Sequence, residues 1–304
     1  IGFGVGYIAT GMAACLLTGG VEHMGHVPMG FMRDPHPRLE EVMGGPSAFN
    51  MGMTAENIHD RFPEFTRDKA DRYALSAQQK ANRAIQAGKM KKMIIPIEVE
   101  QPDGSRVVAD RDQQPRPETS MESLAGLKPA FKENGRVTAG NASRLNYGAG
   151  AVLLMSEKKA ELLGLEPKMR WVASAVAAVD PTVMGTAPVT ATLKALGKAG
   201  LTMKDLDIIE INEAFAVQAI ACMRELGISP EKCNLNGSGI SIGHPVGCTG
   251  ARITYGLAMQ MQKKDATLSF AKMDSLLAKK PTAEAADTLY QRARQEGRTV
   301  VHGV

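Results

Sequence analysis

One histidine occupies a position at which a side chain could carry out proton transfer. His244 follows a glycine-rich segment, residues 234–243, and precedes Pro245, which suits the first position of a helix. The partial positive charge of a helix N-terminus disfavours an imidazolium, so a neutral imidazole there can accept a proton or donate a hydrogen bond near pH 7. The glycines would let a bulky ligand approach the backbone. We interpret His244 as a candidate base; the alternative is a histidine that only hydrogen-bonds the turn.

Two further polar segments could contact a ligand. Asn212 follows the apolar segment 206–211, where a strand would end. Its amide could hold a water or a substrate oxygen at the carboxyl edge of a parallel sheet, or it could simply cap the helix that follows. Glu213 could interact with the N-terminal dipole of that helix. The segment 137–143 is a polar turn of small residues that could cradle a ligand or only turn the chain.

Metal, nucleic-acid and disulfide chemistry find little support in the sequence. His23, His26 and His36 lie close together, but their spacing matches no standard site and no acidic or cysteine ligand completes the set, so we predict no metal. The formal net charge of +4 suits a small anionic ligand rather than nucleic acid. Four cysteines without metal or disulfide spacing are typical of reduced thiols in a cytoplasmic protein: Cys15, Cys222, Cys233 and Cys248.

Length and composition indicate a globular protein of about two domains. Hydrophobic residues make up 44% and charged residues 22% of the 304 residues, as in folded proteins with a core. Residues 1–20 carry no charge, but six of them are glycine and no basic segment precedes them. We interpret them as the end of a buried helix followed by a buried strand, and we predict no membrane span. Because the first residue is Ile1 rather than Met, we expect a fragment or a processed product.

Apolar spacing predicts the elements that would position these residues. From residue 168 onward strands and helices alternate, which predicts βαβ units and a parallel sheet. Residues 21–60 are expected to be irregular, and residues 234–243 to form a strand and a glycine-rich turn. The expected helices are 67–88, 121–126, 188–199, 213–226, 245–262 and 283–293, and the expected strands are 15–18, 94–99, 171–179, 206–211 and 299–304.

Four motifs together resemble the thiolase family. They are Gly-Gly-Val-Glu-His-Met at 19–24, Val-Thr-Ala-Gly-Asn-Ala-Ser at 137–143, Asn-Glu-Ala-Phe-Ala at 212–216 and Gly-His-Pro-Val-Gly at 243–247, in the order and spacing of that family. The resemblance extends from about residue 7 to about residue 263. The segment 20–29, Gly-Val-Glu-His-Met-Gly-His-Val-Pro-Met, is most similar to the 3-ketoacyl-CoA thiolases of fatty-acid β-oxidation, and the biosynthetic acetyl-CoA acetyltransferase type is the alternative.

The resemblance implies an α/β protein with the thiolase fold. This fold is a five-layer αβαβα core of two similar halves, with an inserted loop domain that carries the CoA site. Residues 1–20 and 147–167 would be the remnant of the N-terminal half, which we expect to be incomplete. Residues 21–146 would form the loop domain and 168–263 the C-terminal half. Residues 264–304 do not resemble a thiolase, and we expect a tail foreign to the family there.

The family's reaction implies roles for the candidate residues. Thiolases transfer an acyl group in two steps: one cysteine attacks the keto carbon, and a second protonates the departing acetyl-CoA enolate. By motif position, His244 would activate the nucleophile and Asn212 would hold the water that helps to stabilise the enolate. CoA would enter as a substrate, with no other cofactor. The residues implied to bind the substrate are Ser143 and Ala139 at the pantetheine, Arg116 at the phosphate end, and Phe131, Met184 and Phe215 along an apolar tunnel.

The sequence departs from the family at both catalytic cysteines. The nucleophile would fall before Ile1, Cys15 lies within a strand, and the tail holds no cysteine. Cys248 receives no role, and Tyr147 replaces an acidic residue common in the family. We therefore expect a cytoplasmic relative of acetyl-CoA C-acyltransferases that is inactive as this chain, with a non-catalytic CoA-binding or subunit-partner protein as the alternative. The family also implies a homo-oligomer and a β-oxidation hydratase–dehydrogenase partner.

Overall fold

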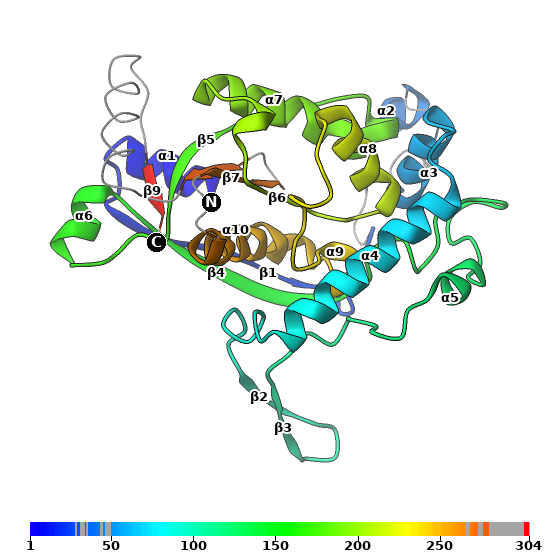
Figure 1. The fold of residues 1–304 in the computed structure, drawn as a ribbon, viewed down its shortest axis with the longest axis horizontal. Helices are drawn as coiled ribbons and strands as arrows, with labels where there is room; N and C mark the ends of the chain where they lie inside the picture. Colours follow the sequence, from blue (N-terminus) through cyan, green and yellow to red (C-terminus); the bar gives the residue numbers. More distant parts are fainter. Residues whose placement is uncertain are drawn as a thin grey trace.

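The computed structural model describes residues 1–27, 29–30, 34, 36–42, 45, 50–264, 268–272, 276–279 and 301–303. The fold is organised around α10 (Val246–Lys264), which confirms the helix expected at 245–262 (Figure 1). One side of α10 contacts β1 (Cys15–His23) and β4 (Tyr147–Met155), and the other contacts β6 (Ile208–Ile211) and β7 (Leu268–Lys272). Ile253 and Leu257 of α10 belong to one buried cluster with residues of both sides, so α10 is a central helix between two β layers.

The strands form one seven-stranded sheet in the order β1-β4-β9-β5-β8-β7-β6, including β5 (Met169–Ser174), β8 (Leu276–Lys279) and β9 (Val301–Gly303). Among the strand pairs of this sheet that the structure describes, β6 and β7 are parallel and the others are antiparallel. The predicted parallel sheet is therefore wrong outside that pair, because β5 and β6, which suggested it, are separated by β8 and β7. β9 confirms the strand expected at 299–304, and the helix expected at 283–293 lies outside the described residues.

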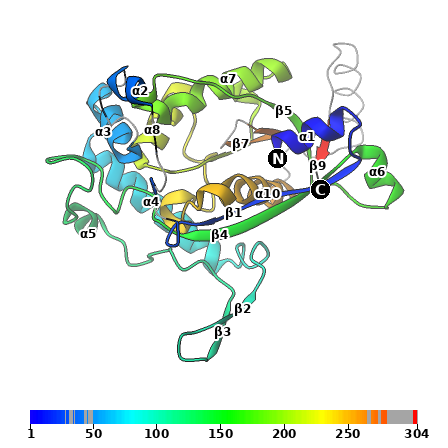
Figure 2. The same cartoon turned by 180° about the vertical axis from the view of Figure 1, so that it is seen from behind.

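Two helices cover the face of β5 and β6 that points away from α10 (Figures 1 and 2). They are α7 (Ala187–Ala199) and α8 (Ala216–Leu226), and both contribute to a buried cluster with Ile209 and Ile211. α7 ends at Gly200, whose φ of +67° suits the glycine predicted as its stop. α8 begins three residues later than the 213–226 helix predicted from the sequence. The helices α7 and α8, the β5-β8-β7-β6 part of the sheet, α10, and the β1-β4 end of the same sheet form consecutive layers of the αβαβα arrangement.

The first 23 residues differ from the sequence prediction. The strands β1 and β4 pair along their whole length and are called the β1/β4 ribbon below. The helix α1 (Gly2–Ala9) packs one face against this ribbon, so Gly4 and Ile8 are its buried residues. The strand β1 continues through the glycine pair at 19–20, and its residues alternate between half-buried and exposed positions. The glycines lie within the strand because they allow close packing: a Cβ at Gly20 would overlap the carbonyl oxygen of Gly247 in α10.

The segment between β1 and β4 holds the long helix α4 (Arg67–Gln86), which confirms the helix expected at 67–88. Residues 21–60 are not uniformly irregular, because they contain α2 (Pro37–Val42) and α3 (Met51–Arg61). The segment 234–243 ends in a short helix, α9 (Gly239–Ile242), instead of a strand. The remaining described elements are α5 (Met121–Ala125), α6 (Glu157–Leu162) and the 3-10 turns η2 (Pro181–Thr186) and η3 (Met203–Asp205).

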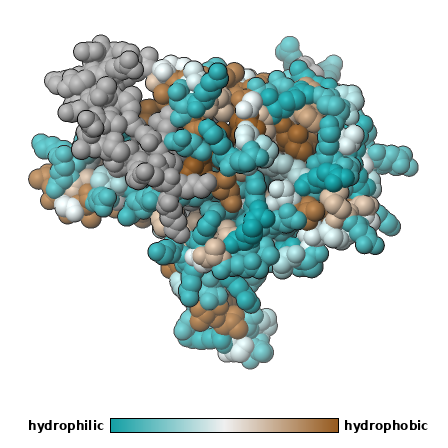
Figure 3. All heavy atoms as spheres, viewed as in Figure 1, coloured by the Kyte–Doolittle hydropathy of each residue, from teal (hydrophilic) through white to brown (hydrophobic). Residues whose placement is uncertain are grey.

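A two-stranded hairpin projects from this segment (Figures 1 and 3). It consists of β2 (Ile97–Glu100) and β3 (Arg106–Ala109), so the strand expected at 94–99 starts later and gains a partner. Apolar side chains such as Ile97 and Val108 are exposed on it, and they account for apolar surface on the projection. Among the described helices, none has both the length and the apolar character required to cross a membrane.

Candidate functional site

The turn at 137–143 is held in place by buried side chains of α3 and α4. Asn141 donates from Nδ2 to Oδ1 of Asp71 at 2.8 Å, and its own Oδ1 accepts from the Thr138 amide at 2.9 Å. Glu56 of α3 accepts from the backbone N–H of Val137 at 2.7 Å and of Arg136 at 2.8 Å. Fixed from both sides, this turn presents a defined backbone to its surroundings.

We predict that Glu56→Ala destabilises the protein by about 2 kcal/mol, because two amide groups, one of them buried, lose their acceptor. Asp60→Asn is the matched control on the same helix. Its pairs with Lys132 at 2.8 Å and Arg136 at 3.2 Å lie at the surface, so we expect a loss below about 1 kcal/mol. Urea unfolding measures both variants, and equal losses would show that the buried carboxylate has no special role.

The polar turn is joined to the segment that contains Asn212. Ser143 donates its N–H to the carbonyl of Ala214 at 2.8 Å, and Ala216 donates to the carbonyl of Asn141 at 2.8 Å. These bonds place Ser143 beside the loop between β6 and α8. Capping of the following helix was one of the two roles expected for Asn212, but α8 begins at Ala216 and Phe215 is its N-cap residue. The amide of Asn212 is therefore not used as a helix cap.

Asn212 is buried, and its Oδ1 has no hydrogen-bond partner among the described residues. The neighbouring Glu213 is fully enclosed. Its carboxylate accepts from Tyr73 at 3.1 Å, from Asn234 at 2.8 Å and from the backbone of Ile240 at 3.3 Å. Burial raises the pKa of Glu213, and the hydrogen bonds oppose that rise. Glu213 thus anchors the loop while the Asn212 carbonyl oxygen remains open to a donor such as water.

The helix α9 brings the His244 segment next to Asn212. A Cβ at Gly239 would lie 2.9 Å from Oδ1 of Asn212, so the two segments are in direct contact. Gln78 of α4 donates to the carbonyl of Ile240 at 3.3 Å. Gly243 has a φ of +94°, and a side chain there would overlap the amide of Asn146. The glycines of this motif therefore permit both the turn and the close approach.

The hydrogen bonds of His244 define its tautomer. Nδ1 lies 2.7 Å from the Thr249 hydroxyl, which itself donates to the carbonyl of Pro245 at 2.8 Å. Because a hydroxyl has one proton, Thr249 accepts from His244, and Nδ1 must carry the hydrogen. Burial, assisted by the positive charge of Arg252, lowers the pKa of His244 to about 4. The imidazole is therefore neutral near pH 7, with a lone pair on Nε2.

The predicted substrate residues occupy two regions. Ser143, Ala139 and Arg116 lie on the segments around the polar turn; Ala139 is exposed, and Ser143 and Arg116 are half-buried. Phe131 and Phe215 meet edge to face with centroids 6.1 Å apart, and the Phe131 ring covers Gly52. Met184 is 40% exposed and follows Val183, which belongs to the same apolar cluster as Phe215. The three apolar residues therefore gather around one cluster.

The role of α4 in the site could not be predicted from the sequence. Asp71, Tyr73 and Gln78 each bond a different part of the site, and Gln78 also accepts the Arg116 amide at 2.9 Å. Tyr73 belongs to the apolar spacing that predicts the helix at 67–88, and Asp71 and Gln78 resemble ordinary polar helix positions, so no local signal indicates their hydrogen bonds to the site. Arg144, next to Ser143, was also missed although its charge adjoins a predicted ligand residue.

The His23 region does not form a metal site in the part of the chain that is described. His23 stacks on Tyr147 with centroids 5.1 Å apart, and its Nδ1 accepts from the His26 amide at 3.0 Å. Within the described ranges, no three His, Cys, Asp or Glu side chains are placed to hold one ion.

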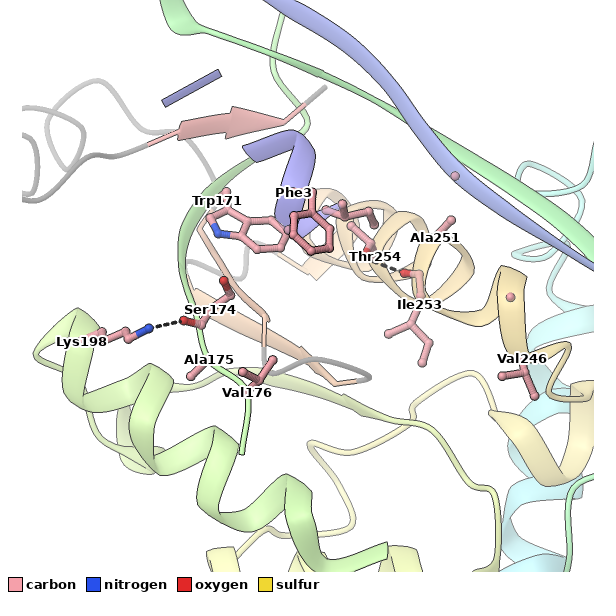
Figure 4. Close-up of a pocket in the computed structure, with 15 residues that line it drawn as sticks. Phe3, Trp171, Ser174, Ala175, Val176, Lys198, Val246, Ala251, Ile253 and Thr254 are labelled. Atoms are coloured by element: carbon pink, nitrogen blue, oxygen red, sulfur yellow. Dashed lines mark hydrogen bonds between the residues drawn. The ribbon is translucent and has the colours of Figure 1, made fainter. Parts of the chain in front are cut away.

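A cavity of about 680 Å³ lies beside the N-terminal half of α10 (Figure 4). Its lining includes Phe3 of α1, Trp171 of β5 and Val246 and Ile253 of α10, and Lys198 donates to the carbonyl of Ser174 at 2.9 Å at its border. None of the predicted substrate residues lines it. The predicted site and this cavity are therefore different places, both adjoining the start of α10.

Comparisons with known proteins agree with this arrangement. The family models "Thiolase, N-terminal domain" and "Thiolase, C-terminal domain" match residues 1–158 and 165–278. The chain is 47% identical over 270 residues to a 3-ketoacyl-CoA thiolase of Shewanella sp. (strain MR-4), covering 88% of this chain and 69% of the relative. A relative of the same name from Shewanella frigidimarina (strain NCIMB 400) is also 47% identical, with the same coverage.

Two solved structures share the fold. The human mitochondrial 3-ketoacyl-CoA thiolase aligns with a TM-score of 0.81 and 34% identity, over 92% of this chain and 75% of the other. The Bacillus anthracis acetyl-CoA acetyltransferase aligns with a TM-score of 0.79 and 38% identity, over 90% and 74%. The domain boundaries of the sequence analysis stay predictions, although the C-terminal family match extends to residue 278. The chain has the thiolase fold and belongs to the thiolase family of acyltransferases.

Proposed function

We propose that this protein is built for the thiolytic cleavage of 3-ketoacyl-CoA to acetyl-CoA and a shortened acyl-CoA, as in fatty-acid β-oxidation. One observation carries the proposal: a neutral His244 with a lone pair on Nε2 lies on a segment that adjoins Asn212, whose amide oxygen has no hydrogen-bond partner among the residues that the structure describes. The names of the relatives at 47% identity support the choice of substrate class.

His244 and Asn212 would have different roles in this reaction. Nε2 of His244 takes the proton of a thiol, and the resulting thiolate attacks the keto carbon. The bond between the keto carbon and the α carbon then breaks, so that the shortened acyl group stays on the thiol and acetyl-CoA leaves as its enolate, which the second cysteine implied by the family would protonate. The Asn212 carbonyl oxygen orients a water by accepting one of its hydrogens. That water and the Nε2–H then donate hydrogen bonds to the thioester oxygen, on which negative charge develops in the enolate. Ser143 and Ala139 would contact the pantetheine, Arg116 the phosphate end, and Phe131, Met184 and Phe215 the acyl chain.

We also propose that the 304 residues by themselves bind CoA but perform no thiolysis. Three of the four cysteines are buried, and burial raises the pKa of Cys248, which disfavours its thiolate. Cys15 is the first residue of β1 and pairs with Met155, whereas Gly20, five residues further along the strand, is the residue that approaches Gly247 next to the His244 turn. CoA is a substrate here and we propose no other cofactor. A homo-oligomer, a hydratase–dehydrogenase partner and a cytoplasmic location remain proposals from the family resemblance.

The test combines binding and turnover. We expect calorimetry to detect acetyl-CoA binding to the chain, and a thiolysis assay with a long-chain 3-ketoacyl-CoA and CoA to show no turnover. Measurable thiolysis would contradict the inactivity proposal, and absent acetyl-CoA binding would contradict the CoA site. If turnover occurs, preference for acetoacetyl-CoA over long chains would favour the acetyltransferase alternative, which the 38% identity to the Bacillus anthracis acetyl-CoA acetyltransferase suggests.

A further inference from the structure

The hairpin of β2 and β3 projects from the rest of the molecule in both views (Figures 1 and 2). Among the elements that the structure describes, the two strands contact mainly each other. A two-stranded hairpin is only marginally stable in water unless it packs against a further strand, sheet or helix. The described part of the chain therefore leaves this hairpin with little of the packing that such an element requires.

The register of the hairpin divides it into two different faces. Residues directly opposite each other in an antiparallel pair point to the same face, and successive residues point to opposite faces. On one face Arg106 and Glu98 form an ion pair at 3.4 Å. The two sets are an apolar face of Ile97, Val99, Val107 and Ala109, and a charged face of Glu98, Glu100, Arg106 and Val108.

The apolar face is open to solvent. Ile97 is 59% exposed, Val107 46% and Val99 36%. β-Branched side chains of this kind are typical of strand faces that pack against another layer, whereas the ion pair on the charged face is suited to water. Exposed apolar surface concentrated on one face of a projecting element is typical of an interaction site. The apolar face is therefore the side of the hairpin that a partner would cover.

The two ends of the hairpin carry opposite charges. Near the tip, the carboxylates of Glu98, Glu100 and Asp103 outnumber the single guanidinium of Arg106, whereas the exposed Lys91 and Lys92 precede the hairpin at its base. Asp103 is five residues and Lys92 six residues from Glu98 along the chain. At about 3.3 Å per extended residue, both charges lie within roughly 20 Å of the middle of the hairpin. The charge pattern is therefore complementary to itself when one hairpin is reversed against another.

We propose that the apolar face is a dimerisation surface, on which two copies of this chain pack their hairpins antiparallel about a two-fold axis. The acidic tip of each hairpin would then lie beside Lys91 and Lys92 of the other copy, whereas a parallel arrangement would place the two acidic tips together. Two stacked hairpins also provide the packing that one lacks. Because the surface is small, we expect a reversible dimer with a dissociation constant in the micromolar range. The inference does not depend on the proposed function.

The first test compares neighbouring valines on opposite faces. Sedimentation equilibrium of the full chain from about 1 to about 200 μM should show a monomer–dimer equilibrium. We expect Val107→Gln to weaken the dimer at least tenfold, because a polar amide enters the contact once from each copy. Val108→Gln is the matched control on the charged face and should stay within about twofold of the parent. Val107→Ile keeps the face apolar and should dimerise at least as tightly as the parent.

The second test examines the antiparallel arrangement through the charges. Lys91→Glu should weaken the dimer by about fivefold or more, because a carboxylate would face the acidic tip of the other copy. Lys194→Glu changes the net charge equally but lies on α7, at the opposite side of the molecule from the hairpin, and should have no effect (Figure 1). Added salt should weaken the parent dimer more than the Lys91→Glu dimer.

Several results would contradict the proposal. A parent that remains monomeric at the highest concentration would exclude the dimer. Association that Val107→Gln and Val108→Gln change equally, or that neither changes, would show that the apolar face is not the contact. If Val107→Ile dissociates as Val107→Gln does, the effect of residue 107 does not come from its apolar character. If Lys91→Glu and Lys194→Glu behave alike, the two hairpins are not antiparallel.

Discussion

Gly20→Ala is expected to reduce the free energy of unfolding by about 3 kcal/mol or more. The added Cβ would overlap the backbone carbonyl of Gly247 at the start of α10, and a backbone oxygen cannot turn aside as a flexible side chain can. In an open strand the same substitution would stabilise by roughly 0.5–1 kcal/mol, because alanine loses less entropy on folding. At Gly20 the overlap outweighs that gain, since relief requires α10 to move off the β1/β4 ribbon.

The matched control is Gly250→Ala in α10. A Cβ at Gly250 meets no atom within 4 Å, so we expect a gain of about 0.5–1 kcal/mol from helix propensity. Urea unfolding of the parent and both variants gives the comparison, and acetyl-CoA binding shows whether the His244 turn has moved with the helix. A Gly20→Ala protein as stable as the parent would mean that β1 and α10 do not approach each other as described.

The elements that could be predicted from the sequence are those with local signals. α4 and α7 have helical apolar spacing and glycines at their ends, and both form where expected. The sheet could not be derived in this way, because pairing depends on which distant strands meet: β4 lies beside β1 after more than a hundred intervening residues. The strand predicted at 15–18 ended before the glycine pair at 19–20, and the position of α10 shows why the longer strand needs small residues there.

In the candidate site, too, local features could be predicted from the sequence and contacts between distant segments could not. The motif around His244 predicts a histidine at a helix N-terminus, and the structure places it there, beside Thr249 five residues later. The contact between Asn212 and the glycines of α9 could be expected only through the family resemblance. Tyr73 and Gln78 gave no signal, because their partners Glu213 and Ile240 lie far away in the sequence. Long-range hydrogen bonds leave no periodic pattern in the chain.

Lowering the pH is expected to destabilise the protein through His244. An unfolded histidine has a pKa near 6.5, whereas burial, assisted by Arg252, lowers the pKa of His244 to about 4 in the folded state. Between these values the unfolded state binds more protons, so the free energy of unfolding falls as pH falls, by up to about 1.4 kcal/mol per pH unit. The full loss is ~2–3 kcal/mol near pH 4, because His244 remains partly accessible to solvent.

Other buried groups titrate in the same range, so the test needs a difference between variants. Burial raises the pKa of Glu210 to about 7, so the folded state binds its proton first and this group stabilises as pH falls. His59, whose pKa burial lowers, acts in the same direction as His244. His244→Asn keeps a donor for the Thr249 hydroxyl and retains both other groups. Between pH 7 and pH 4.5, we expect the free energy of unfolding of this variant to fall by about 2 kcal/mol less than that of the parent.

The lowered pKa of His244 limits its strength as a base. NMR titration of its ring should show the neutral form, with the proton on Nδ1, throughout the range from pH 7 to pH 5. A conjugate acid of such low pKa gives up its proton readily, so a thiol cannot transfer its proton to Nε2 unless the thiolate stays close enough to stabilise the imidazolium. His244 should therefore be a base only in the presence of a bound thiol. Protonation of the ring in the free protein near pH 6.5 would contradict both the burial of His244 and this mechanism.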